Sequence, residues 1–263
     1  MRMTGDPKVI VVMPAYNAER TLQRTLAAIP ADVVSDVILV DDASKDNTVA
    51  LARRLGIHTI EHSRNQGYGA NQKTCYREAL ARGADVVVMV HPDYQYDPTR
   101  IGALVEPILK GEVDAMMGSR LADGRARQRG MPIYKIISNR FLTWIENRAL
   151  GKHYSELHSG FRAFSRRLLE TVPFERNSSD FVFDTQIIFQ LHHLGFRMGE
   201  IPVAARYADD ASSVGFLQSI RYGLATLGVV LAYWRHRKGI GRSPLFEPKN
   251  QPPAPPSAPR APS

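Results

Sequence analysis

The chain has 263 residues, of which 44% are hydrophobic and 23% charged, and its formal net charge is +8. This length and composition predict one well-buried globular domain with appendages and leave too little chain for two full domains. The single cysteine, Cys75, excludes an internal disulfide framework and fits a reducing compartment.

Two kinds of segment are not found in the sequence. No apolar run reaches the 18 residues of a spanning helix, and the first residues carry no secretory signal, so we expect a soluble or peripheral protein. The positive charge suggests polyanionic partners. Its basic stretches lack the aromatic interleaving and zinc-finger spacing of nucleic-acid-binding modules. We therefore expect phosphorylated small molecules or anionic lipid as partners, and no nucleic acid.

Strands and helices alternate over the first 120 residues. Apolar runs predict buried strands at residues 8–13, 37–40, 57–60, 85–90 and 113–117, and helices are expected at 18–29, 46–55 and 69–83. Such alternation predicts a mostly parallel sheet covered by helices on both faces. Ligands of these sheets bind beyond the carboxyl ends of the strands. Here those ends carry polar residues at 14–17, 41–42, 64–65, 91–93 and 118–120.

The second half of the chain has fewer regular signals. Residues 121–140 form a basic loop, and helices are predicted at about 135–150, after the acidic and aromatic segment 180–184, and at 216–235. From residue 248 the chain is too rich in proline to pack, so we expect disorder. The predicted division is 1–215 for the main domain, 216–242 for an amphipathic, basic helix and 243–263 for the tail.

Six segments occur in order: Pro14-Ala-Tyr-Asn-Ala-Glu19, Val40-Asp-Asp-Ala-Ser-Lys-Asp-Asn-Thr48, Asn65-Gln-Gly67, Asp93-Tyr-Gln95, Gly118-Ser-Arg120 and Ser159-Gly-Phe-Arg162. Together they resemble the family 2 inverting glycosyltransferases, most closely the dolichol- and polyprenyl-phosphate sugar (mannose) synthases. The resemblance runs from about residue 8 to 240. It implies a GT-A (Rossmann-like) nucleotide-sugar-binding α/β fold followed by a C-terminal helix.

The resemblance also implies an activity. It is the transfer of a sugar from a nucleoside-diphosphate sugar, GDP-mannose or a UDP-hexose, to a polyprenyl or dolichyl phosphate at the cytoplasmic face of a membrane. Two alternatives stay open. The acceptor is a hydroxyl of a polysaccharide or small metabolite, or the protein is a catalytically silent nucleotide-sugar-binding module.

The donor site implied by the resemblance lies on the first three strand ends. The nucleotide-sugar-binding residues are Pro14, Tyr16, Asn17, Glu19, Asp41, Asp42, Asn65 and Gly67, joined by Asp93 and Arg120. Carboxylates that end a buried strand are costly without partners, which makes a ligand role for Asp41 and Asp42 physically sensible. Turn and helix-capping chemistry is the alternative for this pair.

A divalent cation, Mn2+ or Mg2+, is implied at the end of the fourth strand, where the family has an Asp-x-Asp motif. Here the metal residues are His91, Asp93 and Gln95, so histidine stands in place of the first aspartate. Imidazole suits Mn2+ or a later metal better than Mg2+. His91 therefore ligates metal, hydrogen-bonds a phosphate, or is structural only.

The phosphate-binding and catalytic residues implied by the resemblance lie further along the chain. Arg120, Arg129, Ser159, Arg162 and Arg206 are expected to meet donor or acceptor phosphates, because guanidinium groups bind phosphate bidentately. Asp93, Arg120 and Asp184 are the catalytic candidates. Asp184 is a general base or an N-cap, and an anionic phosphate acceptor needs no base.

The last predicted helix carries one apolar stripe, with the basic residues of 235–242 following at once. The stripe is Leu217, Ile220, Leu224, Leu227, Leu231 and Trp234. A stripe with cations at its end predicts an in-plane helix on an anionic membrane surface. An ordinary core-packing helix is the alternative.

Overall fold

The fold is seen in a computed structural model, which describes residues 5–207 and 216–249. Within these residues a central sheet has seven strands in the order β3-β2-β1-β4-β6-β5-β7. The strands are β1 Val9–Ala15, β2 Asp36–Asp41, β3 His58–Glu61, β4 Val86–Met89, β5 Ala115–Ser119, β6 Arg162–Ser165 and β7 Met198–Pro202. All neighbours are parallel except β6, which runs antiparallel to β4 and to β5.

The apolar strands divide their side chains between two cores. Ile10 and Val12 of β1 belong to one buried cluster, and Val9, Val11 and Met13 belong to another. Successive side chains of a strand point to opposite faces, so a continuous run of valine, isoleucine and methionine predicts burial on both. The sheet is therefore an inner layer with a core on each side.

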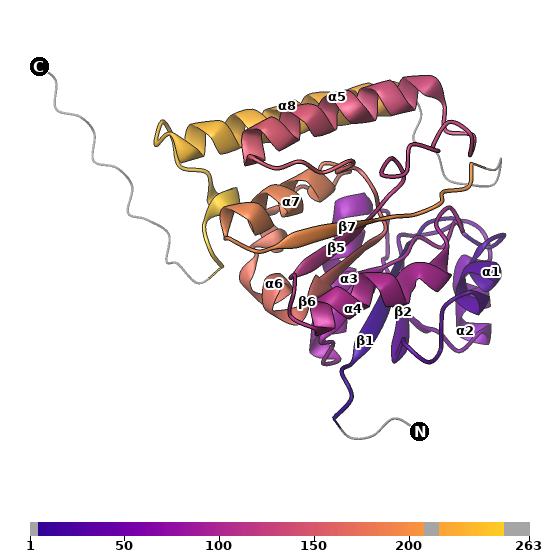
Figure 1. The fold of residues 1–263 in the computed structure, drawn as a ribbon. Coiled ribbons are helices and arrows are strands. Elements are labelled where there is room, and N and C mark those ends of the chain that lie inside the picture. The colour runs from indigo at the N-terminus through magenta and orange to yellow at the C-terminus, as the bar shows by residue number, and fades with distance from the viewer. Residues whose placement is uncertain (1–4, 208–215, 250–263) are drawn as a thin grey trace, which may run out of the picture.

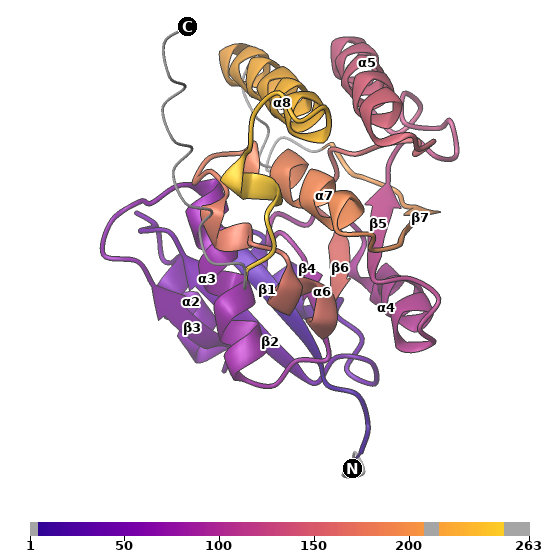
Figure 2. The ribbon, with the colours of Figure 1, turned by 90° about the vertical axis from the view of Figure 1, so that its left-hand side faces the viewer.

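Helices cover both faces (Figures 1 and 2). The helices are α1 Leu22–Ala27, α2 Thr48–Arg54, α3 Tyr68–Ala81, α4 Ile101–Leu109, α5 Ile133–Leu150, α6 Arg166–Thr171, α7 Phe183–His193 and α8 Phe216–Arg237, with 3-10 turns at η1 Pro98–Arg100, η2 Phe174–Arg176 and η3 Pro244–Phe246. Side chains of α3, α6 and α7 fill the first core, and those of α1, α2 and α4 fill the second.

Helices α5 and α8 lie side by side on the outer side of α7 (Figures 1 and 2). A buried polar chain joins them. His158 lies 2.9 Å from Glu146 of α5 through Nε2 and 2.8 Å from the Tyr222 hydroxyl of α8 through Nδ1. Val229 and Tyr233 bring α8 into the first core, each with 5% exposure. The two helices thus form an additional outer layer that is anchored to the domain.

The mostly parallel α/β fold is confirmed, with differences at element ends. The fifth strand begins at Ala115, and the carboxylate of the preceding Asp114 accepts hydrogen bonds from the Arg197 amide and the Arg167 side chain. The first helix begins only at Leu22, after a turn in which the Thr21 amide bonds Ala18 O at 3.1 Å. Helices α4 and α6 and strands β6 and β7 were not predicted as such.

Two further findings concern membrane-spanning segments and the C-terminal tail. No helix among the described residues is long and apolar enough to cross a membrane. Most of the predicted proline-rich tail, residues 250–263, lies outside the described residues, as does the side chain of Leu217.

Candidate active site

The first strand end contributes one buried and one open residue. Pro14 is buried within β1 and pairs with Val40 of β2. Tyr16, two residues later, keeps 49% of its surface exposed. A ring left open beside the carboxyl end of a central strand is available for stacking against a flat ligand.

The loops after β1 and β2 are tied together by the polar residues predicted for the donor site. The Asn17 amide donates to Ser44 Oγ at 2.8 Å, and Asp41 accepts from the amide of the same serine at 2.8 Å. The Glu19 carboxylate accepts from the amide and the side chain of Asn47 at 3.1 and 2.9 Å. Asn17, Glu19 and Asp41 therefore fix the shape of this edge.

Asp42 organises the next loop. Its Oδ1 lies 2.8 Å from His62 Nδ1 and accepts from the Gln66 amide at 2.8 Å, and its Oδ2 accepts from the Gly67 amide at 2.9 Å. Asn65 Nδ2 donates to the Asp42 carbonyl at 3.2 Å. The buried carboxylate is thereby satisfied within the protein, so the turn chemistry left open by the sequence does occur here.

Gly67 is required by backbone conformation and by space. Its φ is 97°, and an added Cβ would lie 2.5 Å from the Ser179 carbonyl oxygen. The loop thus packs against the backbone that precedes α7, and Tyr68 begins α3 immediately after it.

Tyr68 belongs to a cluster centred on Asp184. The carboxylate accepts from the Tyr68 hydroxyl at 3.0 Å and from Gln72 Nε2 at 2.9 Å, and it faces Arg162 Nη1 at 3.1 Å. Burial and the neighbouring Asp184 carboxylate raise the pKa of Tyr68 well above its usual value. The phenol therefore stays protonated and serves as a donor. Asp184 does not cap α7, since Val182 is the capping residue.

His91 is the neighbour of Tyr68 on the other side. Its Nε2 lies 3.2 Å from the Tyr68 hydroxyl, and the two rings stack with centroids 5.6 Å apart. Burial lowers the pKa of His91, so the imidazole is neutral. Because the Tyr68 proton goes to Asp184, His91 must donate from Nε2–H, which leaves the Nδ1 lone pair as its acceptor. A Cβ on Gly160 would lie 2.5 Å from His91 Nε2.

The segment after β4 holds an unusual tyrosine. Tyr94 has a φ of 53°, and the guanidinium carbons of Arg24 and Arg206 lie 4.0 and 4.6 Å from its ring centroid. Asp93 Oδ1 accepts from the Gln95 amide at 3.0 Å, and the Gln95 carbonyl accepts from the Arg206 amide at 2.8 Å. Two exposed arginines thus converge on the ring of Tyr94, the residue after Asp93.

The residues Asp93, His91 and Gln95 suit a metal cation that also takes ligands from a bound substrate. Across residues 5–207 and 216–249, no three His, Cys, Asp or Glu side chains lie close enough together to hold a metal ion. Mg2+ in proteins is usually bound through one or two carboxylates plus substrate phosphates. Asp93 supplies one such carboxylate, and His91 Nδ1 and Gln95 are further donors nearby in the sequence.

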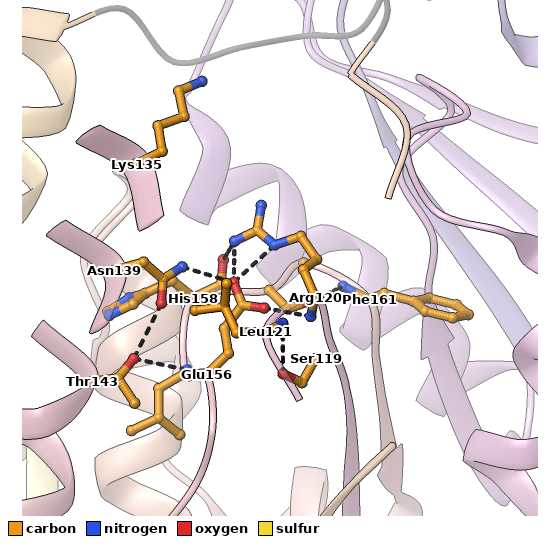
Figure 3. Close-up of polar contacts among 12 residues, drawn as sticks. Ser119, Arg120, Leu121, Lys135, Asn139, Thr143, Glu156, His158 and Phe161 are labelled. Atoms are coloured by element: carbon orange, nitrogen blue, oxygen red, sulfur yellow. Dashed lines mark hydrogen bonds and ion pairs between the residues drawn. The ribbon is translucent and has the colours of Figure 1, made fainter. Parts of the chain in front are cut away.

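A second polar cluster surrounds Arg120 at the end of β5 (Figure 3). Arg120 Nε donates to Glu156 Oε1 at 2.8 Å, and the Arg120 amide donates to Glu156 Oε2 at 2.6 Å. Asn139 of α5 donates to the same carboxylate at 2.7 Å. Burial disfavours the charged carboxylate, but Arg120 and these hydrogen bonds outweigh it and lower the pKa of Glu156.

Lys135 lies on α5 one helical turn before Asn139 (Figure 3). Burial and the nearby charge of Arg120 lower the pKa of its ammonium group. Within the described part of the chain, Lys135 forms no ion pair with a carboxylate. Arg120 is neutralised by Glu156, so the cluster keeps one net positive charge, that of Lys135. A bound anion would offset the burial and the repulsion from Arg120 that disfavour the charged form of Lys135.

The other predicted phosphate ligands differ in their surroundings. Ser159 is fully buried, with its Oγ accepting from the Phe161 amide at 3.3 Å. Arg162 is 1% exposed and faces Asp184, whereas Arg206 is exposed. Arg129 pairs with Asp123 at 2.6 Å within the basic loop. Arg162 therefore belongs to the cluster around Asp184, Arg206 lies over Tyr94, and Arg129 is partly neutralised in its own loop.

Five polar residues of the two clusters were not anticipated from the sequence. They are Tyr68, Gln72, Lys135, Asn139 and Glu156. One signal was present, since Glu156 stands three residues before Ser159 of the recognised motif. The others lie on helices whose partners depend on how the helices pack.

Comparison with known proteins places this geometry in a family. Residues 10–172 match the model "Glycosyl transferase family 2". A UDP-N-acetylglucosamine–dolichyl-phosphate N-acetylglucosaminyltransferase of Methanococcus voltae is 24% identical over 86% of this chain and 99% of its own. An undecaprenyl-phosphate mannosyltransferase of Micrococcus luteus is 27% identical over 74% of this chain and 82% of its own. Glucosyl-3-phosphoglycerate synthase of Mycobacterium tuberculosis, crystallised with Mn2+ and UDP, superposes with a TM-score of 0.64 at 21% identity. The superposition covers 89% of this chain and 81% of that one.

The fold, its mostly parallel sheet and the family match agree with one another. The chain is a glycosyltransferase and belongs to glycosyl transferase family 2.

Proposed function

We propose that this glycosyltransferase transfers a sugar, with inversion, from a nucleoside-diphosphate sugar to a polyprenyl- or dolichyl-type lipid phosphate. The donor is GDP-mannose or a UDP-hexose, and a divalent cation takes part. The reaction occurs at the cytoplasmic face of a membrane, on which the protein lies peripherally. The observation that carries this proposal is an exposed apolar face formed by α5 and α8.

The α5/α8 apolar face is built from large side chains that remain open to solvent. Its residues are Ile133, Tyr134, Ile137, Phe141 and Trp144 on α5 and Ile220, Leu224, Leu227, Leu231 and Trp234 on α8, with exposures from 37% to 66%. The stripe predicted on α8 is therefore not its core-packing side, which is formed by Thr226, Val229 and Tyr233.

Such a face supports attachment to a membrane surface. Contiguous apolar patches of this kind are rare on soluble monomers and mark interaction sites. Both tryptophans of the chain, Trp144 and Trp234, belong to the face. Tryptophan is enriched at membrane–water interfaces, and in-plane helices bury their apolar side at that depth.

The Arg120 cluster supports a phosphate acceptor. Lys135, whose pKa is lowered by burial and by Arg120, sits on the same helix as the apolar residues Ile133 and Ile137. A lipid phosphate entering beside the first turns of α5 would meet Lys135 and Arg120 while its hydrocarbon chain stays along the apolar face. Guanidinium and ammonium groups suit phosphate oxygens.

The state of Asp184 also favours a phosphate over a hydroxyl acceptor. A hydroxyl acceptor needs a general base, and Asp184 is the carboxylate proposed for that role. Its oxygens already accept hydrogen bonds from Tyr68 and Gln72 and face Arg162, so both are engaged within the protein. A phosphate acceptor is already anionic, so it needs no such base.

On the donor side, we propose that Tyr16 borders the nucleobase, with Pro14, Asn17, Glu19, Asp41, Asp42, Asn65 and Gly67 shaping the pocket around the nucleoside. Asp93, with His91 and Gln95, would hold the cation, and Arg206 would contact the diphosphate. A bound divalent cation supplies charge neutralisation for the departing nucleoside diphosphate. Arg129, Ser159 and Arg162 are assigned to the acceptor side.

The direct test is transfer from labelled GDP- and UDP-sugars to polyprenyl phosphate in the presence of Mn2+. We expect a lipid-linked monosaccharide phosphate of inverted anomeric configuration. Transfer only to hydroxyl acceptors would reject the lipid acceptor. Donor binding in a thermal-shift assay, without transfer or hydrolysis, would reject catalysis and leave a binding module.

A further inference from the structure

The two stripes of the α5/α8 apolar face end in cations. Arg148 stands four residues after Trp144 on α5, and Lys238 stands four residues after Trp234 on α8. Residues four apart lie on the same side of a helix. The apolar side of each helix therefore continues directly into a positive charge at its C-terminal end.

These two ends meet. A hollow of about 300 Å3 lies between them, and it is lined by Arg148, Ala149, Tyr233, Trp234, Arg237 and Lys238. Because it joins the last turns of both helices, α5 and α8 run in the same direction. The meeting point thus concentrates three cations around one tryptophan.

The three cations are exposed, and the guanidinium carbon of one of them, Arg237, lies 5.8 Å from the centroid of the Tyr233 ring. Among the described residues, none of Arg148, Arg237 and Lys238 forms an ion pair with a carboxylate. Helix C-termini attract cations by about 0.3–1 kcal/mol each. That attraction accounts for a cation at one helix end, but it does not account for a shared hollow with an exposed indole beside it.

We propose that this hollow binds the phosphate headgroup of an anionic phospholipid in the membrane on which the α5/α8 apolar face lies. The inference rests on the membrane attachment in the proposed function. Arginine binds phosphate oxygens bidentately, and tryptophan occupies the headgroup level of a bilayer. The hollow has room for a headgroup and opens beside the apolar surface that would carry the acyl chains.

The hollow is distinct from the proposed acceptor site. Lys135 and Arg148 are thirteen residues apart on α5, which at 1.5 Å per residue is roughly 20 Å. One helix would then touch the membrane at two phosphates, the acceptor near its start and a structural phospholipid at its end. This two-point contact would set how the active site is oriented over the bilayer.

The experiment compares two double variants that remove equal charge. Arg148→Gln/Arg237→Gln removes two of the three cations of the hollow, and Arg235→Gln/Arg242→Gln removes two cations that line a different hollow further along the chain, beside Leu231 of α8. Binding is measured by co-sedimentation with phosphatidylcholine vesicles with and without phosphatidylglycerol. A cation near an anionic surface is worth about 1 kcal/mol, or roughly fivefold in affinity.

The expected result is that both pairs weaken binding, with at least a further fivefold loss for Arg148→Gln/Arg237→Gln beyond its control. Equal losses of vesicle binding in the two double variants would mean that the cations attract the anionic surface only through their charge, and would overturn the proposed site. Equal binding of the native protein to vesicles without phosphatidylglycerol would also overturn it. Thermal protection by inorganic phosphate alone, lost in Arg148→Gln/Arg237→Gln while vesicle binding matches the control pair, would overturn a lipid as the source of the phosphate.

A separate assay keeps this inference apart from the proposed function. Transfer to a short-chain, water-soluble polyprenyl phosphate needs no vesicle. Failure of that transfer, with vesicle binding that depends on the hollow, would reject the lipid acceptor and retain the phospholipid site. Successful transfer, with equal vesicle binding of the two double variants, would retain the lipid acceptor and reject the phospholipid site.

Discussion

The Tyr68 hydroxyl donates a hydrogen bond to Asp184 Oδ2 at 3.0 Å and thereby joins the start of α3 to the start of α7 across 116 residues of sequence. Gln72, one turn further along α3, donates to the other carboxylate oxygen at 2.9 Å. The carboxylate is thus held by two donors from one helix and faces the buried Arg162. This arrangement fixes where Asp184 lies.

Tyr68→Phe tests that relationship. The variant loses the hydrogen bonds that position Asp184 and His91, so we expect kcat to fall at least tenfold, because a displacement of about 1 Å in an active site can cost roughly a hundredfold in rate. Tyr154→Phe is the control, because this tyrosine donates its hydroxyl to the Met198 carbonyl at 3.0 Å and not to Asp184, Gln72 or Arg162. Equal kcat in the two variants, at similar melting temperatures, would show that the Tyr68 hydroxyl is only structural.

Asp93→Asn should abolish divalent-cation-dependent transfer while the fold is kept. The amide keeps the shape of the side chain but removes the charge that would hold the cation against the diphosphate. Asp97→Asn is the control, because Asp97 accepts from the Thr99 amide at 3.1 Å and caps η1. Activity assays with Mn2+ and with EDTA check the prediction. Native turnover in Asp93→Asn, or full native activity in EDTA, would contradict it.

His91→Asp should raise activity with Mg2+ relative to Mn2+, because a hard oxygen replaces the Nδ1 lone pair. The measurement is the ratio of the two activities at saturating metal. An unchanged ratio would remove His91 from the metal site and leave it the role visible in the structure, the contact with Tyr68 at 3.2 Å. Gly160→Ala serves as a comparison, since its Cβ would displace His91 without changing the ligand type.

Much of the donor edge could be predicted because its contacts are local. The bonds between Asp42 and the amides of Gln66 and Gly67 link residues about 25 apart, in the loops that follow the adjacent parallel strands β2 and β3. Strand ends that are adjacent in sequence order meet at one edge, so their polar residues converge. Alternation of strands and helices was therefore sufficient to place them together.

The Tyr68–Asp184 bond and the α5/α8 apolar face could not be predicted in this way. The first depends on how α3 packs against α7, and helical periodicity does not say which helices touch. The second depends on which side of each helix is covered, because an exposed apolar stripe and a buried one have the same spacing. On α5 the stripe is further obscured by Lys135, Arg140 and Arg148.

A pH dependence of stability is expected from His192 of α7. Burial and the nearby Lys152 lower its pKa from 6.5 to about 4. Between these values the unfolded state binds the proton and the folded state does not, so the free energy of unfolding falls as the pH falls from 6.5 to 4, by up to about 3 kcal/mol. His192→Phe, which keeps a ring against Tyr154, should flatten this dependence in denaturant titrations. The exposed His153→Asn should keep it, and an equal slope in both variants would assign the effect elsewhere.

Leu224→Glu decides whether the α5/α8 apolar face meets a membrane. Leu224 is 66% exposed, so a carboxylate there stays in water and should change the free energy of unfolding by no more than about 0.5 kcal/mol. On a bilayer the same charge would have to enter the interface, so we expect vesicle binding and transfer to long-chain polyprenyl phosphate to be lost. Val229→Glu is the control on the same helix, because Val229 is 5% exposed and a buried carboxylate should cost several kcal/mol. Tryptophan fluorescence gives the direct readout, since Trp144 and Trp234 both lie on this face and should shift to the blue with vesicles only in the native protein. A stable Leu224→Glu variant that still binds vesicles and shows the native shift would remove the face from membrane attachment and make a soluble acceptor the better explanation.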